Sequence, residues 1–250
     1  MRAGVKAPPS SQLHDVRWHD LECGAYLADQ PLWRELAAAA PGAVLDVGSG
    51  TGRVALELGR AGHAVTALDS DASLLSALRL RGAHLPLATA LADARAFDLD
   101  HRFALCVAPM QTVQLLGGRD GRARFLRCAR RHLHPGGTLA AALAGPLESF
   151  DSETAAELPL PDRYEHEGWV YSSQPVAIRR RAGITEIHRV RRTLAPDGAS
   201  EQARDVICLD ELSGSDLEAE GLAAGFTPLP RRHISPSRDH VGSTVIMLCA

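Results

Sequence analysis

Residues 44–53, VLDVGSGTGR, constrain the fold more than any other stretch of the chain. A short apolar run is followed by glycine at every second position, Gly48, Gly50 and Gly52. Glycine allows positive φ and lets a ligand lie against bare main chain. A buried strand that ends in such a loop and then opens a helix is typical of the ligand-binding turn of α/β proteins, where helix N–H groups suit an anion.

The rest of the N-terminal half alternates between short apolar runs and amphipathic segments. Predicted strands cover 43–48, 63–71, 84–90, 102–110 and 138–145. Predicted helices cover 52–62 and 71–82, and a third begins at 121 and stops at Pro135. Apolar strands of this length that alternate with helices form parallel sheets covered on both faces. Right-handed crossovers then give a doubly wound fold.

The pattern changes near residue 146. Residues 146–165 are predicted to be a loop, and three segments with partial period-2 alternation, 169–181, 184–194 and 201–212, predict an antiparallel β insertion. A helix over 213–225, capped by Ser213 or Ser215, and a final antiparallel strand pair over 226–234 and 242–250 restore the α/β pattern.

The predicted domain spans residues 13–250 and contains a mostly parallel seven-stranded sheet, with an insertion of about residues 150–210 after the fifth strand. Residues 1–12 are expected to be disordered, and residues 13–40 to form a helical cover interrupted near Gly24. The N-terminal helices over 13–30 and the insertion lie outside the alternating pattern, so they are candidates for a lid.

Composition limits the choice of partners and compartment. The net charge of −3 argues against a polyanionic partner, and the arginine clusters at 119–131 and 179–192 are interpreted as solvated faces. The five cysteines form no CxxC pair, so we expect free thiols, no metal site and a cytoplasmic protein. No apolar stretch has transmembrane length.

Two ligand classes fit the glycine-rich turn. A dinucleotide site needs GxGxxG/A with a small third residue, but Arg53 occupies that position. Asp46, two residues before the first glycine, would repel a pyrophosphate and could instead pair with an ammonium group. A NAD(P)-dependent oxidoreductase is therefore the disfavoured alternative.

The motif LDVGSGTGR resembles motif I of the class I S-adenosylmethionine (SAM)-dependent methyltransferases. Four further stretches resemble later motifs of that family and occur in the same order: ALDSD (67–71), LADAR (91–95), FALCVAPMQTVQLL (103–116) and LHPGGTLA (133–140). The resemblance covers roughly residues 30–145, and the terminal strand pair fits the family's ending. It implies a Rossmann-like sheet and SAM as the cofactor.

The resemblance also implies residues for each part of SAM. Asp46, Gly48, Ser49 and Gly50 would hold the amino-acid tail, and Asp69 with Ser70 the ribose. Asp93 and Ala94 would bind the adenine, and Ala108 and Met110 would flank the sulfonium. Other interpretations stay open: Asp69 as a cap of the next helix, Asp93 as a turn residue and Met110 as core.

The resemblance implies in-line transfer of the methyl group to N or O of a small molecule, for which positioning matters most. Tyr26 and Gln111 are candidates for groups near the methyl, and Trp18 and Trp169 for additional acceptor contacts, although both tryptophans could be packing anchors. Alternatives are an RNA- or protein-directed methyltransferase and a SAM-binding protein without catalysis. Neither monomer nor homodimer is favoured.

Overall fold

The computed structural model describes residues 11–153, 158–237 and 240–250, which form two compact units. The α/β unit contains residues 26–147 and 210–250, and the insertion unit contains the described residues up to Ala25 together with those of 148–209. The chain passes from one unit to the other at three crossings, 25/26, 147/148 and 209/210.

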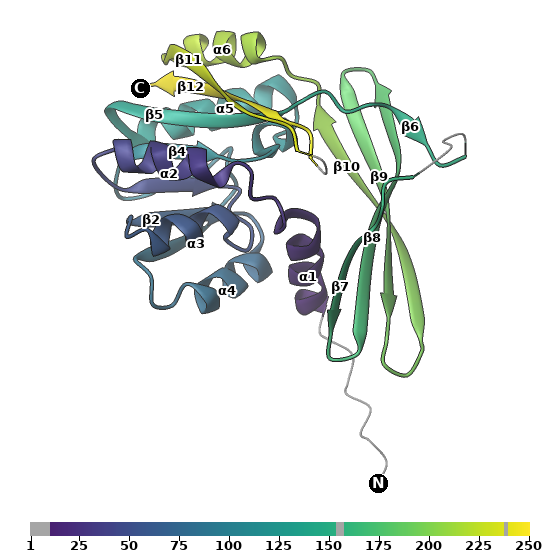
Figure 1. Ribbon diagram of the computed structural model, residues 1–250. Helices are drawn as coiled ribbons and strands as arrows, with labels where there is room; N and C mark the ends of the chain where they lie inside the picture. The colour runs from purple at the N-terminus through teal and green to yellow at the C-terminus, as the bar shows by residue number, and fades with distance from the viewer. Residues whose placement is uncertain (1–10, 154–157, 238–239) are drawn as a thin grey trace. The chain divides into compact units, whose positions relative to one another are not determined.

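The α/β unit is built on a seven-stranded sheet of order β11-β12-β5-β4-β1-β2-β3 (Figure 1). The strands are β1 (Val44–Val47), β2 (Val65–Asp69), β3 (Leu87–Leu91), β4 (Phe103–Ala108), β5 (Leu133–Ala144), β11 (Thr227–Ile234) and β12 (Ser243–Cys249). The pairs β3–β2, β2–β1, β1–β4 and β4–β5 are parallel, whereas β12 pairs antiparallel with β5 and β11. This confirms the predicted doubly wound, mostly parallel sheet.

Helices cover both faces of this sheet, and each face has its own apolar cluster. The helices are α2 (Gln30–Ala39), α3 (Arg53–Arg60), α4 (Ala72–Arg81), the 3-10 turn η1 (Thr112–Leu115), α5 (Gly118–His132) and α6 (Gly214–Ala223). Trp33, Leu58 and Leu75 from α2, α3 and α4 lie in one cluster, and Phe125 and Leu217 from α5 and α6 lie in the other. The central strands β1, β2 and β4 are mostly apolar because both sides of the sheet are buried there, whereas the edge strands β3 and β11 are partly exposed.

The insertion unit combines α1 (Ser11–Cys23) with a β-sheet. Its strands are β6 (Phe150–Asp151), β7 (Asp162–His166), β8 (Trp169–Arg181), β9 (Ile184–Leu194) and β10 (Ser200–Asp210). The fully buried Tyr171 is central: its hydroxyl accepts a hydrogen bond from Arg17 Nη1 at 2.6 Å, and its ring packs edge-on against Trp18. Glu22 accepts two hydrogen bonds from Arg191, at 2.8 and 2.7 Å. The predicted antiparallel insertion is confirmed.

Three expectations about the chain between elements need correction. Helix α1 begins at Ser11, so the expected disordered segment is too long by two residues, and residues 1–10 lie outside the described part. The expected cover 13–40 divides, because α1 belongs to the insertion unit and α2 to the α/β unit. The expected loop 146–165 contains β6 and β7; every residue of β7 is exposed, so no apolar alternation announces it.

Two expectations about α5 also need correction. The helix ends at His132 rather than at Pro135, because Leu133 already pairs with Phe103 of β4. Its arginines do not all form a solvated face, since Arg122 is only 6% exposed. Among the described residues, no helix is long and apolar enough to span a membrane.

Candidate functional site

The candidate site lies where the order of the parallel strands reverses, between β1 and β4. Asp46 of β1 pairs with Ala67 of β2 on one side and with Val107 of β4 on the other. The carboxyl ends of these strands therefore meet beside the glycine loop, residues 47–53. Ligands of open α/β sheets bind at such a switch point.

The glycine loop requires glycine at two positions for different steric reasons. Gly48 has φ +71°, and a Cβ there would lie 2.7 Å from Thr112 Oγ1 of η1. Gly52 has φ +97°, and its Cβ would lie 2.1 Å from Leu78 Cδ1 of α4. Gly52 thus allows α3 and α4 to pack closely. Arg53 is consequently free to point elsewhere.

Asp46 is a buried carboxylate without a hydrogen-bond partner. The residue is 1% exposed, and neither carboxylate oxygen has a partner within hydrogen-bond distance among the described residues. Burial raises the pKa of Asp46 to about 7; Arg53 and the Ala55 backbone N–H lower it, and the Asp69 and Asp29 carboxylates raise it further. Ser49, 6% exposed, has a hydroxyl that is likewise unpaired. Because unpaired buried polar groups are costly, these atoms fit a polar or cationic ligand.

Asp69 joins the end of β2 to the glycine loop. Its Oδ2 accepts a hydrogen bond from the Gly50 N–H at 2.8 Å, and its Oδ1 accepts one from the Asp71 N–H at 2.9 Å. The alternative that Asp69 caps the next helix is wrong, because Asp71 caps α4 by accepting from Ser73 and Leu74. A carboxylate retains acceptor capacity beyond these two bonds. Ser70 follows it in an exposed position.

Asp93 lies in the turn after β3, at the same edge of the sheet as Asp69. Its Oδ1 accepts from the Arg95 backbone N–H at 2.8 Å, and the Arg95 guanidinium donates to both of its oxygens. This pairing lowers the pKa of Asp93 to about 2. Asp93 therefore does act as a turn residue, as the alternative interpretation held. Contact of Asp93 and Ala94 with the adenine stays a prediction.

The segment after β4 brings three more predicted residues beside the loop. Ala108 is fully buried at the end of the strand. Met110 has φ +55° and packs against the apolar cluster of α2, α3 and α4. Gln111 is half-buried, and its backbone carbonyl accepts a hydrogen bond from the Gln114 backbone N–H at 2.8 Å.

Arg53 binds the N-terminal end of the α/β unit, which sequence reasoning missed. Its guanidinium donates to the Tyr26 carbonyl at 2.8 Å, and it forms a two-point ion pair with Asp29. Asp29 also accepts a hydrogen bond from Trp33 Nε1 at 2.8 Å. The spacing of Asp29 and Trp33, four positions apart at the start of a helix, was an available signal for part of this cluster.

Tyr26 is the predicted catalytic candidate that this cluster contains. The residue is 7% exposed, and the Arg53 guanidinium lies 5.2 Å from the centre of its ring. The ring packs edge-on against His240 at 4.9 Å. Burial raises the pKa of the Tyr26 hydroxyl, so it stays protonated at neutral pH.

The two predicted acceptor-binding tryptophans belong to the insertion unit. Trp18 contacts Tyr171 and Arg191, and Trp169 contacts His14. Both therefore serve as packing residues within their own unit, and a part in acceptor binding stays a prediction. Among the described residues, no three His, Cys, Asp or Glu side chains gather in a metal-binding group.

Residues 44–137 match the family model described as a methyltransferase domain. These residues form a methyltransferase domain. It contains every predicted cofactor residue from Asp46 to Met110, and the match confirms the predicted class of enzyme, a methyltransferase. No curated protein sequence matches the chain significantly.

Solved structures extend the likeness beyond the methyltransferase domain to both units. The CcbJ methyltransferase of Streptomyces caelestis has a TM-score of 0.67 and 23% identity, with 91% of this chain and 92% of that chain covered. The sugar N-methyltransferase KedS8 of a Streptoalloteichus species has a TM-score of 0.69 and 20% identity, covering 98% and 97%. SAM-bound CalS10, an amino pentose methyltransferase of Micromonospora echinaspora, has a TM-score of 0.62 and 21% identity, covering 98% and 99%. These likenesses confirm the class I methyltransferase fold.

Proposed function

We propose that this protein transfers a methyl group from SAM to an amino nitrogen of a small molecule. The observation that carries the proposal is the unpaired Asp46 carboxylate at the switch point, beside a loop whose glycines have positive φ. A buried carboxylate in this position fits the ammonium of the SAM amino-acid tail, because an opposite charge favours its ionised form.

The other parts of SAM fit neighbouring groups of the methyltransferase domain. Gly48, Gly50 and the Ser49 hydroxyl would contact the tail. Asp69, with Ser70 beside it, would accept from the ribose hydroxyls with the capacity its two backbone bonds leave. Asp93 and Ala94 would take the adenine edge, and Ala108 and Met110 would lie beside the sulfonium. The bound SAM of CalS10 agrees with this cofactor.

Transfer then depends on how the chain positions the acceptor. When bound, SAM supplies an electrophilic methyl group on a good leaving group. Because little further activation is needed, alignment of the attacking nitrogen is the principal task of the protein. The buried Tyr26 hydroxyl can orient a polar acceptor group without ionising, since burial raises its pKa. Gln111 is the second candidate for that role, and neither has to act as a base.

An amino acceptor is favoured over a hydroxyl by the named activities of similar structures. KedS8 is a sugar N-methyltransferase, and CalS10 an amino pentose methyltransferase. Trp18 and Trp169 of the insertion unit remain candidates for acceptor contacts. The five free cysteines support a cytoplasmic location, and the net charge of −3 disfavours a nucleic-acid substrate. The assembly would be a monomer or a homodimer.

Calorimetric titration tests the cofactor. The purified protein would be titrated with SAM, S-adenosylhomocysteine (SAH) and NADH. Binding of SAM and SAH without binding of NADH supports the proposal. Binding of NADH alone would overturn it and favour the oxidoreductase alternative.

An acceptor screen tests the substrate class. Amino sugars, aminoglycosylated peptides, matched sugars with hydroxyl in place of amino, total RNA and denatured protein would each be incubated with methyl-labelled SAM. Label in the amino compounds alone is the expected result. Label only in RNA or protein would replace the acceptor class, and SAM binding without any transfer would favour the non-catalytic alternative.

A further inference from the structure

Gln114 is a buried amide whose two ends hydrogen-bond to two distant parts of the backbone. It lies in η1, only six residues after the end of β4, and is 8% exposed. Its Oε1 accepts from the Ala144 N–H at 2.9 Å, and its Nε2 donates to the Asp210 carbonyl at 3.2 Å. An amide accepts at its oxygen and donates at its nitrogen, so a single side chain serves both partners.

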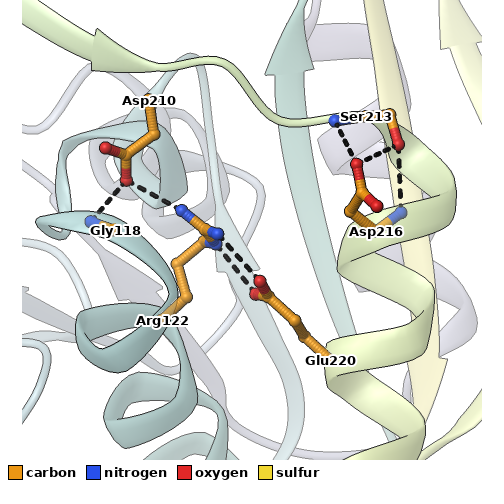
Figure 2. A network of polar contacts seen from close by, with 6 residues as sticks. All are labelled: Gly118, Arg122, Asp210, Ser213, Asp216 and Glu220. Atoms are coloured by element: carbon orange, nitrogen blue, oxygen red, sulfur yellow. Dashed lines mark hydrogen bonds and ion pairs between the residues drawn. The ribbon is translucent and has the colours of Figure 1, made fainter. Parts of the chain in front are cut away.

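The two partners of Gln114 lie next to two of the three crossings. Ala144 ends β5, three residues before the chain leaves for the insertion unit, and Asp210 is the first residue after it returns. The Asp210 side chain is fixed separately, because its Oδ2 accepts from the Gly118 N–H at 2.7 Å and from Arg122 Nη1 at 2.8 Å. Figure 2 shows Asp210 held by Gly118 and Arg122 of α5. The residues that flank the inserted segment are therefore both attached to η1, and Asp210 is attached to α5 as well.

The same turn, η1, packs against the glycine loop. Thr112 lies so close to Gly48 that a Cβ on the glycine would be 2.7 Å from its Oγ1. The Thr112 hydroxyl is held by donating to the Pro109 carbonyl at 2.8 Å. Contacts thus run without a gap from the cofactor loop through η1 to both crossings. The remaining crossing has an equivalent contact, because Arg53, directly after Gly52, donates to the Tyr26 carbonyl.

We propose that Gln114 is a positioning residue that couples occupancy of the cofactor loop to the two ends of the inserted segment 148–209. The inference rests on the proposed function, because the ligand that fills the loop is SAM. A ligand held by Asp46 and the loop backbone restricts Gly48, hence Thr112 and η1, and the Gln114 amide passes that restriction to Ala144 and Asp210. Coupling between sites requires such a set of contiguous contacts, and its existence has to be measured.

Amide hydrogen exchange of the full chain, with and without SAH, tests the coupling. SAH is expected to slow exchange in the glycine loop and, by about fivefold or more, in residues 144–149 and 209–213. In Gln114→Leu, SAH should still bind and protect the glycine loop, whereas its effect on both crossings should fall below about twofold. A merely structural role would change exchange at the crossings equally with and without SAH.

Two further variants keep the test decisive. Gln114→Glu retains the acceptor for Ala144 but loses the donor to Asp210, so the SAH effect should persist at 144–149 and disappear at 209–213. The matched control is Arg130→Met, which removes a side-chain hydrogen bond to the Gly225 carbonyl. The bonded residues are 95 positions apart in the sequence, compared with 96 for Gln114 and Asp210. That control should leave the SAH response unchanged.

The outcomes separate the inference from the proposed function. The coupling is overturned, and the cofactor stands, if SAH binds and protects the loop but exchange at the crossings does not respond to SAH. It is likewise overturned if both Gln114 variants respond to SAH as strongly as the unmodified protein does. If calorimetry detects no SAH binding, the proposed function falls, and the coupling with it.

Discussion

Two regions of the α/β unit bury charged side chains in opposite ways. Between α5 and α6, Arg122 donates to both oxygens of Glu220 at 2.8 Å, and to Asp210 at 2.8 Å (Figure 2). At the end of β1, the Asp46 carboxylate is equally buried and has no partner. Desolvation penalises both regions, but only the first offsets it with hydrogen bonds made by the chain itself. The difference teaches that the first region is satisfied by the chain itself, whereas the second leaves a carboxylate for which the proposed SAM ammonium would be a partner.

The largest expected effect comes from breaking the paired region. Arg122→Met leaves the buried Glu220 and the partly buried Asp210 without their cation, and should lower the free energy of unfolding by about 3–5 kcal/mol. SAH affinity should stay unchanged, because Arg122 touches no predicted cofactor residue. Urea denaturation monitored by circular dichroism, together with calorimetry on the folded variant, measures both quantities.

A double variant controls this experiment. Arg122→Met combined with Glu220→Leu removes one of the stranded charges and should recover part of the lost stability. If the single variant unfolds like the unmodified protein, the network contributes nothing and the contrast between the two regions is lost.

The unpaired region should respond in the opposite sense. Asp46→Asn removes the charge that would bind the SAM ammonium, which should cost about 1.5–3 kcal/mol of binding, or roughly 10–150-fold in Kd. Stability should not fall, because the substitution also removes a buried unpaired charge. The control is Asp210→Asn, a paired and partly buried carboxylate, which should lower stability and leave SAM affinity intact. An Asp46→Asn variant with unchanged SAM affinity would remove the proposed tail site.

The pH dependence sharpens the same contrast. The pKa of Asp46 is about 7 without ligand, so below that pH the ligand must displace a proton. SAH affinity should therefore rise by up to about tenfold per pH unit between pH 5.5 and 6.5 and level off above 7. Calorimetry at pH 6 in buffers of different ionisation enthalpy should detect release of nearly one proton, which Asp46→Asn should abolish.

The folded-state pKa also predicts an effect on stability. Between about pH 4 and pH 7 the folded protein holds a proton on Asp46 that the unfolded chain has lost. The contribution of Asp46 to the free energy of unfolding should consequently decrease as pH rises through that window. A stability difference between Asp46→Asn and the unmodified protein that does not grow with pH would contradict the raised pKa.

The sequence predicted those features that depend on local pattern. Short apolar runs and capping residues sufficed for the parallel strands and for Asp71 as a helix cap, and the glycine spacing sufficed for the glycine loop. The cap of α6 was narrowed to Ser213 or Ser215, and the structure selects Ser213. Arg53, Gln114 and Arg122 were not predicted as structural links, because their partners are 24 to 98 positions away. Strand β7 and the grouping of α1 with the insertion were also missed, since neither leaves a local hydrophobic period.

The smallest expected effect concerns Asp93, which lies between the two extremes of the comparison. Its carboxylate is exposed and already held by Arg95, so it needs no ligand to satisfy it. A contact to the adenine amino group should contribute about 0.5–1.5 kcal/mol, or roughly 2–12-fold in Kd. Asp93→Ala should therefore weaken SAH slightly, and leave the affinity of S-inosylhomocysteine, which has a carbonyl in place of the amino group, unchanged. Asp100→Ala, another exposed aspartate, paired with His101, is the control and should alter neither affinity. If Asp93→Ala weakens both ligands equally, Asp93 supports the loop through Arg95 and does not recognise the base.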